Sequence, residues 1–149
     1  MTCIGYAPGA FDLFHIGHLN LLRRAKEHYD YLIAGVVADE VLIAHKRVVP
    51  VVPLMERLEI VRNVRFVDAA YAATTNDKIQ IWKRLKFNIL FKGNDWQGTE
   101  KGIRLEQDFA AIGVKVIYFP YTLSTSSSAL RKTLRNIDAK ANHHVRHVG

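Results

Sequence analysis

Short apolar runs alternate along this chain with segments in which apolar residues recur every three or four positions. The first pattern predicts strands and the second predicts helices. The predicted strands cover residues 3–6, 31–38, 66–68, 89–91 and 114–119. The predicted helices cover residues 19–28, 40–44, 54–64, 77–86, 105–112 and 130–137. The segment KRVVPVVP (46–53) contains two prolines and is expected to form an extended loop.

The alternation of strands and helices predicts one α/β domain. Repeated strand–helix–strand units build a parallel sheet with helices on both faces. The run 31–38 (YLIAGVVA) is apolar at almost every position, which is typical of a strand buried on both faces. We therefore expect a single Rossmann-like, three-layer domain over residues 1–137. Residues 138–149 carry no core pattern and are expected to form a mobile tail.

Polar side chains follow several of the predicted strands, at the edge where parallel sheets bind ligands. His15 and His18 follow the first strand, and Asp39 comes at the end of the second. Asp95 follows the fourth strand, and a segment rich in serine and threonine (124–128) follows the last. Because the carboxyl ends of parallel strands share one edge, we expect these groups to converge on a single site.

The segment GAFDLFHIGH, from Gly9 to His18, carries the strongest chemical signal. The helix predicted after it would offer free backbone N–H groups and the positive end of its dipole, and both favour a phosphate. His15 and His18 add side-chain donors, and Gly17 lets a ligand approach the backbone. The segment therefore indicates chemistry on a triphosphate. Asp12 within it could either orient a histidine or cap a turn.

The charge of the chain fits an anionic partner. The formal net charge of +7 suits a nucleotide or a sugar phosphate, and it also suits nucleic acid. The lysines and arginines are spread over several predicted elements, however, so we expect no nucleic-acid partner. The single cysteine, Cys3, excludes an internal disulfide and fits a cytoplasmic location. No apolar run approaches the roughly 18 residues that span a bilayer, so no membrane partner is expected.

Residues 15–18 (HIGH) match the HxGH signature of the nucleotidylyltransferase superfamily. Over nearly its whole length the chain more closely resembles the glycerol-3-phosphate cytidylyltransferases of cell-wall polymer synthesis. That resemblance rests also on VRFVD (64–68), KGNDW (92–96) and the Ser-Thr-Ser run at 124–126. It implies transfer of CMP from CTP to a small polyol phosphate, foremost glycerol 3-phosphate, with Mg²⁺ on the triphosphate and pyrophosphate leaving. It also implies a cytoplasmic homodimer.

The same resemblance implies roles for individual residues. His15, His18 and Lys46 would be catalytic, because they would contact the phosphates as charge develops in the transition state. The acceptor phosphate would be bound by Lys46, Arg57 and Arg65. The nucleotide would be bound by Gly9, Ala10, Phe11, His15, His18, Asp95, Ser124 and Thr125. No protein ligand for a metal is expected, because the histidine group 143–147 falls in the predicted tail.

This chain departs from that family at several positions, which leaves the acceptor open. Val48 stands where the family has a second lysine, and Asn94 stands where the family's GDDW motif has its first aspartate. The loop that contains Tyr121 and Thr122 is shorter and lacks the family's arginine.

Other interpretations fit the same residues. Another HxGH transferase could use a different alditol phosphate, phosphoethanolamine, phosphocholine or a flavin. HIGH also occurs in class I aminoacyl-tRNA synthetases, although no anticodon-binding segment is evident. A non-enzymatic basic nucleic-acid-binding module is a third alternative. The hydroxyl cluster could be only an N-cap for the last helix, and Trp96 could be only a packing residue.

Overall fold

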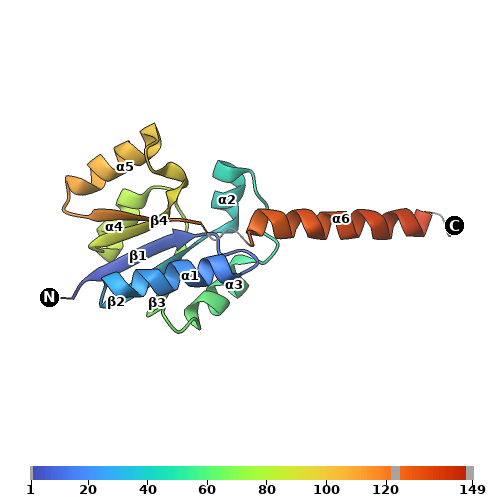
Figure 1. The fold of residues 1–149 in the computed structure, drawn as a ribbon, viewed down its shortest axis with the longest axis horizontal. Coiled ribbons are helices and arrows are strands. Elements are labelled where there is room, and N and C mark those ends of the chain that lie inside the picture. The colour runs from blue at the N-terminus through green and yellow to red at the C-terminus, as the bar shows by residue number, and fades with distance from the viewer. Residues whose placement is uncertain (1, 122–124, 147–149) are drawn as a thin grey trace.

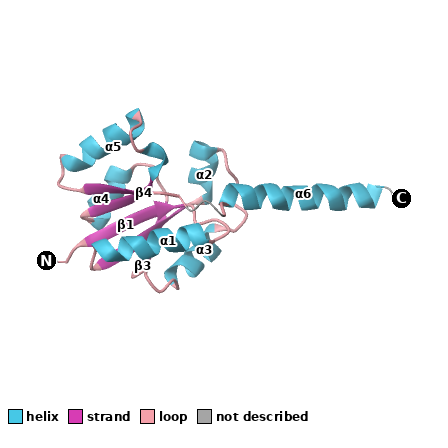
Figure 2. Cartoon of the chain, in the orientation of Figure 1, coloured by secondary structure: helices cyan, strands magenta, loops and turns pink. Residues whose placement is uncertain are grey.

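The computed structural model describes residues 2–121 and 125–146, which form a sheet between two layers of helices (Figure 1). The elements are β1 (Ile4–Gly9), α1 (Ile16–Ala25), η1 (Lys26–His28), β2 (Tyr31–Val37), α2 (Asp39–Lys46), α3 (Leu54–Arg62), β3 (Ala69–Ala73), α4 (Lys78–Leu85), β4 (Ile89–Gly93), η2 (Asn94–Trp96), α5 (Glu100–Ala110), β5 (Lys115–Phe119) and α6 (Ser127–Arg146). Figure 2 shows the strands lying between the two layers of helices. The predicted α/β fold class is confirmed.

The sheet has five parallel strands in the order β3-β2-β1-β4-β5, so β1 is central. Helices α1 and α3 cover one face, where Leu22 and Val61 belong to one core cluster with Ala7. Helices α4 and α5 cover the other face, where Ile81 and Phe109 cluster with Tyr6. Because every strand pair is parallel, all the carboxyl ends lie at one edge. That edge is where the loop after β1 and the start of α6 meet.

The strand predicted over residues 66–68 is wrong, because β3 covers Ala69–Ala73 instead. Phe66 lies in a turn and packs against the core, so its apolar character reflects burial and not a strand. Asp68 begins the pairing with β2: its Oδ2 accepts from the Leu32 amide at 2.7 Å, and its own amide donates to the Leu32 carbonyl at 3.0 Å. Alanine has a low strand propensity, so tertiary pairing rather than local sequence places this strand.

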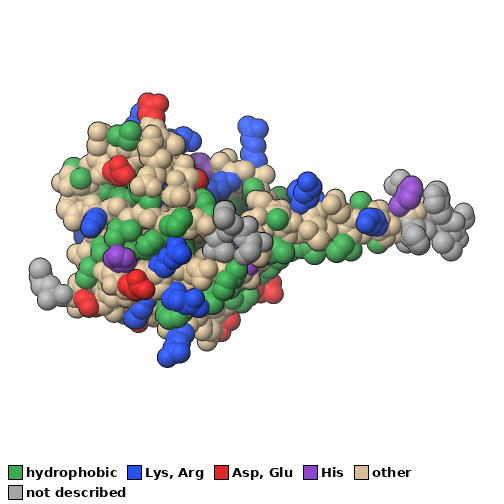
Figure 3. Space-filling view, viewed as in Figure 1, with side chains coloured by type: hydrophobic (Ala, Val, Ile, Leu, Met, Phe, Trp, Pro, Cys, Tyr) green, Lys and Arg blue, Asp and Glu red, His purple; other side chains and the backbone are tan. Residues whose placement is uncertain are grey.

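Helix α6 is longer than predicted and projects from the body of the molecule (Figure 1). The terminal helix predicted over 130–137 lies inside it, and the helix continues to Arg146 through residues that were expected to form a tail. No glycine or proline interrupts α6, and it is rich in good helix formers. The side chains of residues 132–143 are exposed, Leu134 and Ile137 among them. Apolar side chains lie along one side of α6 (Figure 3).

Among the helices within residues 2–121 and 125–146, none is both long and apolar enough to cross a membrane.

Tyr6 lies on the central strand β1, and its ring has room only because Gly35 on the adjacent strand β2 carries no side chain. A Cβ atom at Gly35 would lie 2.0 Å from the Tyr6 hydroxyl oxygen. The Tyr6 ring is fully buried and stacks on Phe87 with ring centroids 4.8 Å apart. The hydroxyl has no hydrogen-bond partner among the described residues, and burial raises the pKa of Tyr6 well above its ordinary value. The ring therefore contributes packing, whereas the hydroxyl is a buried polar group without compensation.

We expect Tyr6→Phe to raise the free energy of unfolding by about 1 kcal/mol, because it removes a buried hydroxyl that has no partner. Gly35→Ala should lower it by about 2 kcal/mol, because a methyl group has no room beside the ring. Urea denaturation followed by circular dichroism measures both changes. Tyr29→Phe is the matched control and should destabilise, since the Tyr29 hydroxyl donates to the Phe66 carbonyl at 3.3 Å. A loss of stability in Tyr6→Phe would contradict this account.

Candidate active site

A cavity of about 550 Å³ opens at the carboxyl edge of the sheet. Its walls come from the end of β1 and the loop after it, from α1, α2, the start of α4 and η2, and from the segment after β5 with the start of α6. The predicted site residues that line it are Gly9, Ala10, Phe11, His15, His18, Lys46, Asp95 and Thr125. The fold therefore brings these residues together, while their individual roles stay predictions. Ser124 lies outside the described residues.

The two histidines begin helix α1 and cap it. His15 is the N-cap residue, and its Nδ1 accepts a hydrogen bond from the Gly17 amide at 3.0 Å. His18 Nδ1 accepts from the His15 amide at 3.2 Å. This reciprocal capping box satisfies N–H groups that the first turn of a helix leaves unpaired. It also brings the imidazole rings together, with centroids 4.0 Å apart.

The capping contacts determine where the imidazole protons lie. An Nδ1 atom that accepts a hydrogen bond carries no proton, so the neutral ring has its proton on Nε2. Burial lowers the pKa of His15. Burial, together with the neighbouring His15, lowers the pKa of His18 to about 4. Near pH 7 both rings are therefore neutral, and each has an Nε2–H donor available at the cavity that both residues line.

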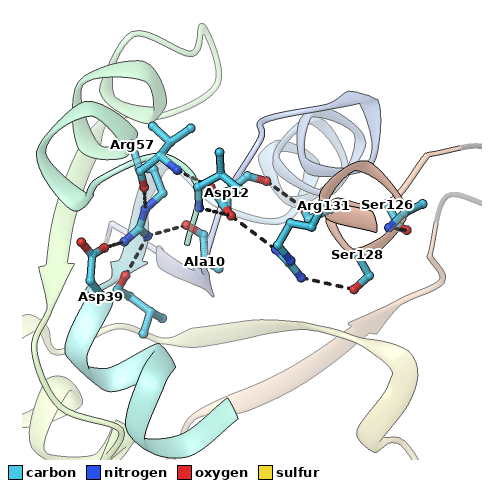
Figure 4. Close-up of polar contacts among 12 residues, drawn as sticks. Ala10, Asp12, Asp39, Arg57, Ser126, Ser128 and Arg131 are labelled. Atoms are coloured by element: carbon cyan, nitrogen blue, oxygen red, sulfur yellow. Dashed lines mark hydrogen bonds and ion pairs between the residues drawn. The ribbon is translucent and has the colours of Figure 1, made fainter. Parts of the chain in front are cut away.

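Asp12 connects the loop that contains His15 to the segment before α3 and to the start of α6 (Figure 4). Its carboxylate oxygens accept from the amides of Val51 and Val52, each at 2.9 Å. The carboxylate also pairs with Arg131 of α6 at 3.3 Å, and the Ser127 hydroxyl donates to the Asp12 carbonyl at 2.7 Å. Asp12 is only 1% exposed. Of the two roles predicted for Asp12, these contacts favour the structural one.

Arg57 does not line the cavity, so the structure gives no support to its predicted contact with a phosphate. Its side chain is fully buried, and Nε donates to the Val52 carbonyl at 2.8 Å. Nη1 donates to the carbonyls of Ala10 and Val37, both at 2.7 Å, and Nη2 pairs with Asp39 (Figure 4). A guanidinium held in this way ties the ends of β1 and β2 to the loop before α3. Asp39, which was expected at the ligand-binding edge, is used in the same contact.

Arg65 is also absent from the cavity lining. It is exposed in the turn between α3 and β3, four residues before Ala69 begins that strand. The amino ends of parallel strands lie at the edge opposite the cavity, so Arg65 lies far from the cavity and its predicted contact with a phosphate finds no support here. The resemblance predicted the role of Arg65 from its position in the sequence, whereas the path of the chain between α3 and β3 determines where its side chain lies.

Two lysines that the sequence did not single out, Lys78 and Lys92, line the cavity with Lys46. Lys92 lies at the carboxyl end of β4, and that position was an available signal. Lys78 begins α4, and only the fold brings it to this edge. Burial lowers the pKa of Lys92 to about 7, with help from Lys78 and Lys46. Burial and Lys46 also lower the pKa of Lys78. The cavity therefore gathers positive charge that an anion would stabilise.

The KGNDW segment forms a firm part of the cavity wall. Lys92 Nζ lies 3.4 Å from the centroid of the Trp96 ring, which favours a cation–π contact. Asp95 Oδ1 accepts from the Tyr121 hydroxyl at 2.8 Å. Helix α5 approaches so closely that a Cβ at Gly102 would lie 1.9 Å from the Trp96 carbonyl oxygen. Trp96, expected to serve packing, lines the cavity with Asp95.

The hydroxyl cluster caps α6 and also faces the cavity. The Ser126 hydroxyl accepts from the Ala129 amide at 3.1 Å, as an N-cap does. The Ser128 hydroxyl accepts from Arg131 at 3.2 Å. Thr125, Ser126 and Ser128 nevertheless line the cavity. Capping therefore accounts for part of the cluster, and its contact with a triphosphate stays a prediction.

A family model described as Cytidylyltransferase-like matches residues 6–133, a range that contains all the cavity-lining residues described above. The chain belongs to the cytidylyltransferase-like family. The nucleotidyltransferase superfamily suspected from the HIGH motif is thereby confirmed.

Relatives and a solved structure extend this assignment to the cytidylyltransferase-like family. The chain is 31% identical to glycerol-3-phosphate cytidylyltransferase of Staphylococcus aureus over 134 residues, which are 89% of this chain and 95% of that protein. It is 30% identical to FAD synthase of Thermococcus kodakarensis over 130 residues, 87% of each chain. The lipopolysaccharide core biosynthesis protein of Thermoplasma volcanium shares the fold, with a TM-score of 0.69 and 23% identity over 82% of this chain and 98% of that one.

Membership of the cytidylyltransferase-like family does not select the substrates. One of the two relatives is a cytidylyltransferase and the other is an FAD synthase, at nearly equal identity and coverage.

We expect Arg57→Met to lower the free energy of unfolding by about 3 kcal/mol, because it leaves buried carbonyls and the Asp39 carboxylate without their donor. Chemical denaturation measures the loss. Arg62→Met is the control: Arg62 pairs with Glu59 at the exposed surface, so its loss should cost about 0.5 kcal/mol or less. If Arg57→Lys kept wild-type stability but lost affinity for phosphate-bearing substrates, the originally predicted phosphate contact would be restored.

Proposed function

We propose that this protein is a cytidylyltransferase that transfers CMP from CTP to a small polyol phosphate, foremost glycerol 3-phosphate. The observation that carries the proposal is the meeting of two motifs in one cavity. The neutral, capped pair His15 and His18 lies there together with Asp95 and Trp96 of KGNDW. KGNDW is one of the motifs that, together with HIGH and VRFVD, carry the resemblance to the glycerol-3-phosphate cytidylyltransferases, and the S. aureus relative supports the same assignment.

In the proposed reaction, a phosphate oxygen of the acceptor attacks the α-phosphorus of CTP. The bond from that phosphorus to the oxygen bridging the α- and β-phosphates breaks as the new P–O bond forms, and pyrophosphate leaves with the electron pair. Such a transfer needs positioning and charge stabilisation more than covalent help from the protein. His15 and His18 donate from Nε2–H to phosphate oxygens as negative charge shifts onto the leaving group. Lys46 neutralises charge between the two substrates, which would otherwise repel.

Mg²⁺ is proposed as the counter-ion of the triphosphate. Within residues 2–121 and 125–146, no group of three or more His, Cys, Asp or Glu side chains is placed to hold a metal ion. Mg²⁺ is commonly bound through one or two carboxylates together with substrate phosphates and waters. Asp95 fits that pattern, because it is the carboxylate among the described lining residues. The ion would supply charge neutralisation of the triphosphate.

The second candidate is an adenylyltransferase that joins ATP to FMN. It is favoured by the similarity to the T. kodakarensis FAD synthase, which spans 87% of this chain. It uses the same proposed chemistry, since the phosphate of FMN would attack the α-phosphorus of ATP. Homodimer formation and a cytoplasmic location remain predictions for either candidate, and light scattering tests the first of them.

We expect pyrophosphate release from CTP with glycerol 3-phosphate at a rate at least tenfold above that of ATP with FMN. The measurement crosses CTP and ATP with glycerol 3-phosphate, phosphoethanolamine and FMN in the presence of Mg²⁺. The charged groups available in the cavity suit any phosphate acceptor, so the nucleotide decides between the candidates. Turnover of ATP with FMN, and none with CTP and any of the acceptors, would overturn the cytidylyltransferase assignment.

We expect His15→Asn and His18→Asn each to lower kcat by about 10²-fold, the effect of removing one preorganised donor. Asparagine keeps an acceptor for the capping contact, so α1 and the fold should be preserved. The KM for CTP should change much less than kcat. Steady-state kinetics with circular dichroism measure both effects. His28→Asn, at an exposed residue away from the cavity lining, is the control. Near-normal kcat in both cavity variants would refute the role of the histidines.

A further inference from the structure

Helix α6 leaves the body of the molecule with most of its surface uncovered. Figure 1 shows it projecting from the body, which extends on both sides of the helix axis in this view. Ser127 and Arg131, in its first turns, hold it to Asp12. The side chains of residues 132–143 are exposed. A helix of this length, about 30 Å, gains little stability on its own in water, so we expect a partner along it.

An apolar row on α6 follows the spacing of a coiled coil. Successive members of the row are four, three and four residues apart, the spacing of the a and d positions of a heptad, and they are Leu130, Leu134, Ile137 and Ala141. Leu134 is 41% exposed and Ile137 is 57% exposed. All four positions fall within an arc of about 60°, because each residue turns the helix by about 100°. So narrow a row fits the seam between two helices, whereas a helix that lies on a membrane or a sheet needs a wider apolar face.

The charges beside this row favour a second copy of the chain as the partner. Asp138 borders the row on one side and Lys140 on the other, whereas Lys132 and Arg135 lie on the far side of the helix. An anionic membrane or an acidic partner in the seam would be repelled by the carboxylate of Asp138. A second α6 in antiparallel orientation instead brings Arg131 beside that carboxylate, because both residues occupy e positions of the heptad.

We propose that α6 pairs with the α6 of a second copy as an antiparallel coiled coil, with a two-fold axis near the middle of the apolar row. In this register Leu134 packs against Ile137 of the second copy, and Leu130 packs against Ala141 of the second copy. Each helix makes the same contacts, as a closed two-fold dimer requires. The inference goes beyond the proposed function and does not depend on which substrates the protein uses.

The shape of the molecule favours the antiparallel orientation. Paired helices lie about 8–10 Å apart, whereas the body is wider than α6 on both sides in Figure 1. Parallel helices would bring the two bodies to the same end of the pair, where they would overlap. Antiparallel helices leave one body at each end.

Apolar surface beside the start of α6 enlarges this interface. Stable interfaces bury about 1,600 Å² in total, more than so short a seam supplies. Val49 is 70% exposed and Val51 is 49% exposed in the loop between α2 and α3. This loop adjoins α6, because the Val51 amide and the Arg131 guanidinium both contact Asp12 Oδ2. In the antiparallel pair the far end of the second α6 lies beside that start, where the two valines add apolar contact area.

The first test is sedimentation equilibrium of the full chain between about 1 and 100 µM, with circular dichroism to verify folding. The wild type should form a dimer in this range. Leu134→Glu and Ile137→Glu should each weaken the dimer by about 100-fold or more, because each would bury two unpaired carboxylates in the seam. Asn136→Glu adds the same charge at an exposed position outside the row and should match the wild type. Pelleting with vesicles of phosphatidylserine and phosphatidylcholine tests a membrane as the alternative partner, and no binding is expected.

Disulfide trapping in a Cys3→Ser background tests the orientation. Ala141→Cys alone should form no disulfide, because the two introduced thiols would lie about 16 Å apart along the antiparallel pair, beyond the roughly 7 Å that a disulfide can bridge. A mixture of the Ala141→Cys chain with the Leu130→Cys chain should form a disulfide between them.

A wild type that stays monomeric at about 100 µM would overturn the inference. So would a dimer that both Glu variants in the row leave unchanged, an equal loss in Asn136→Glu, or binding to the vesicles that Leu134→Glu abolishes. A disulfide in Ala141→Cys alone would overturn the antiparallel orientation. Failure of the proposed function gives a different result, namely no pyrophosphate from CTP with any acceptor while the dimer still depends on the apolar row of α6.

Discussion

The buried carboxylate of Asp12 joins three chain segments that the sheet alone would leave unconnected. It accepts from two amides of the loop before α3 and pairs with Arg131 of α6, while its own backbone carries the loop that ends at His15. Phe11 and Leu13 on either side adopt left-handed backbone conformations, with φ of 52° and 51°. Each costs about 1 kcal/mol, and the Asp12 contacts offset that strain. The placement of the histidines therefore depends on one satisfied buried charge.

The cavity contains two kinds of group that can contact phosphates, neutral histidine donors and lysine cations. The histidines are forced to be neutral donors, because capping occupies Nδ1 and burial disfavours the charged ring. The lysines supply positive charge, and burial together with their mutual repulsion lowers the pKa of Lys92 and of Lys78. Neutral donors can follow charge as it shifts during the reaction, whereas cations hold substrate anions in place before it. In the proposed reaction, the lysines would bind the substrates and the histidines would stabilise the transition state.

Several features were predictable because they are local. The HIGH segment, the buried strand 31–38 and the helix that Asp77 caps at Ile79 and Gln80 are all encoded within a few residues. The strand at Ala69–Ala73 was not predictable, because alanines carry no strand signal and β2 supplies the pairing. Arg57 was assigned to phosphate by resemblance to the family, whereas its partners include backbone carbonyls 5, 20 and 47 residues away.

The sequence by itself determined the α/β class, the edge of the sheet that carries the site and the histidine motif, because periodicity and short motifs are local properties of the chain. Lys46 was predicted at the cavity, but the tertiary structure decided which of the other cations reach it. Lys78 and Lys92 enter it, whereas Arg57 is withdrawn into the core and Arg65 lies at the opposite edge. The physical reason is that a long basic side chain can be solvated, paired with buried carbonyls or aimed at a ligand. Contacts between segments distant in the sequence determine which of these three environments each basic side chain occupies.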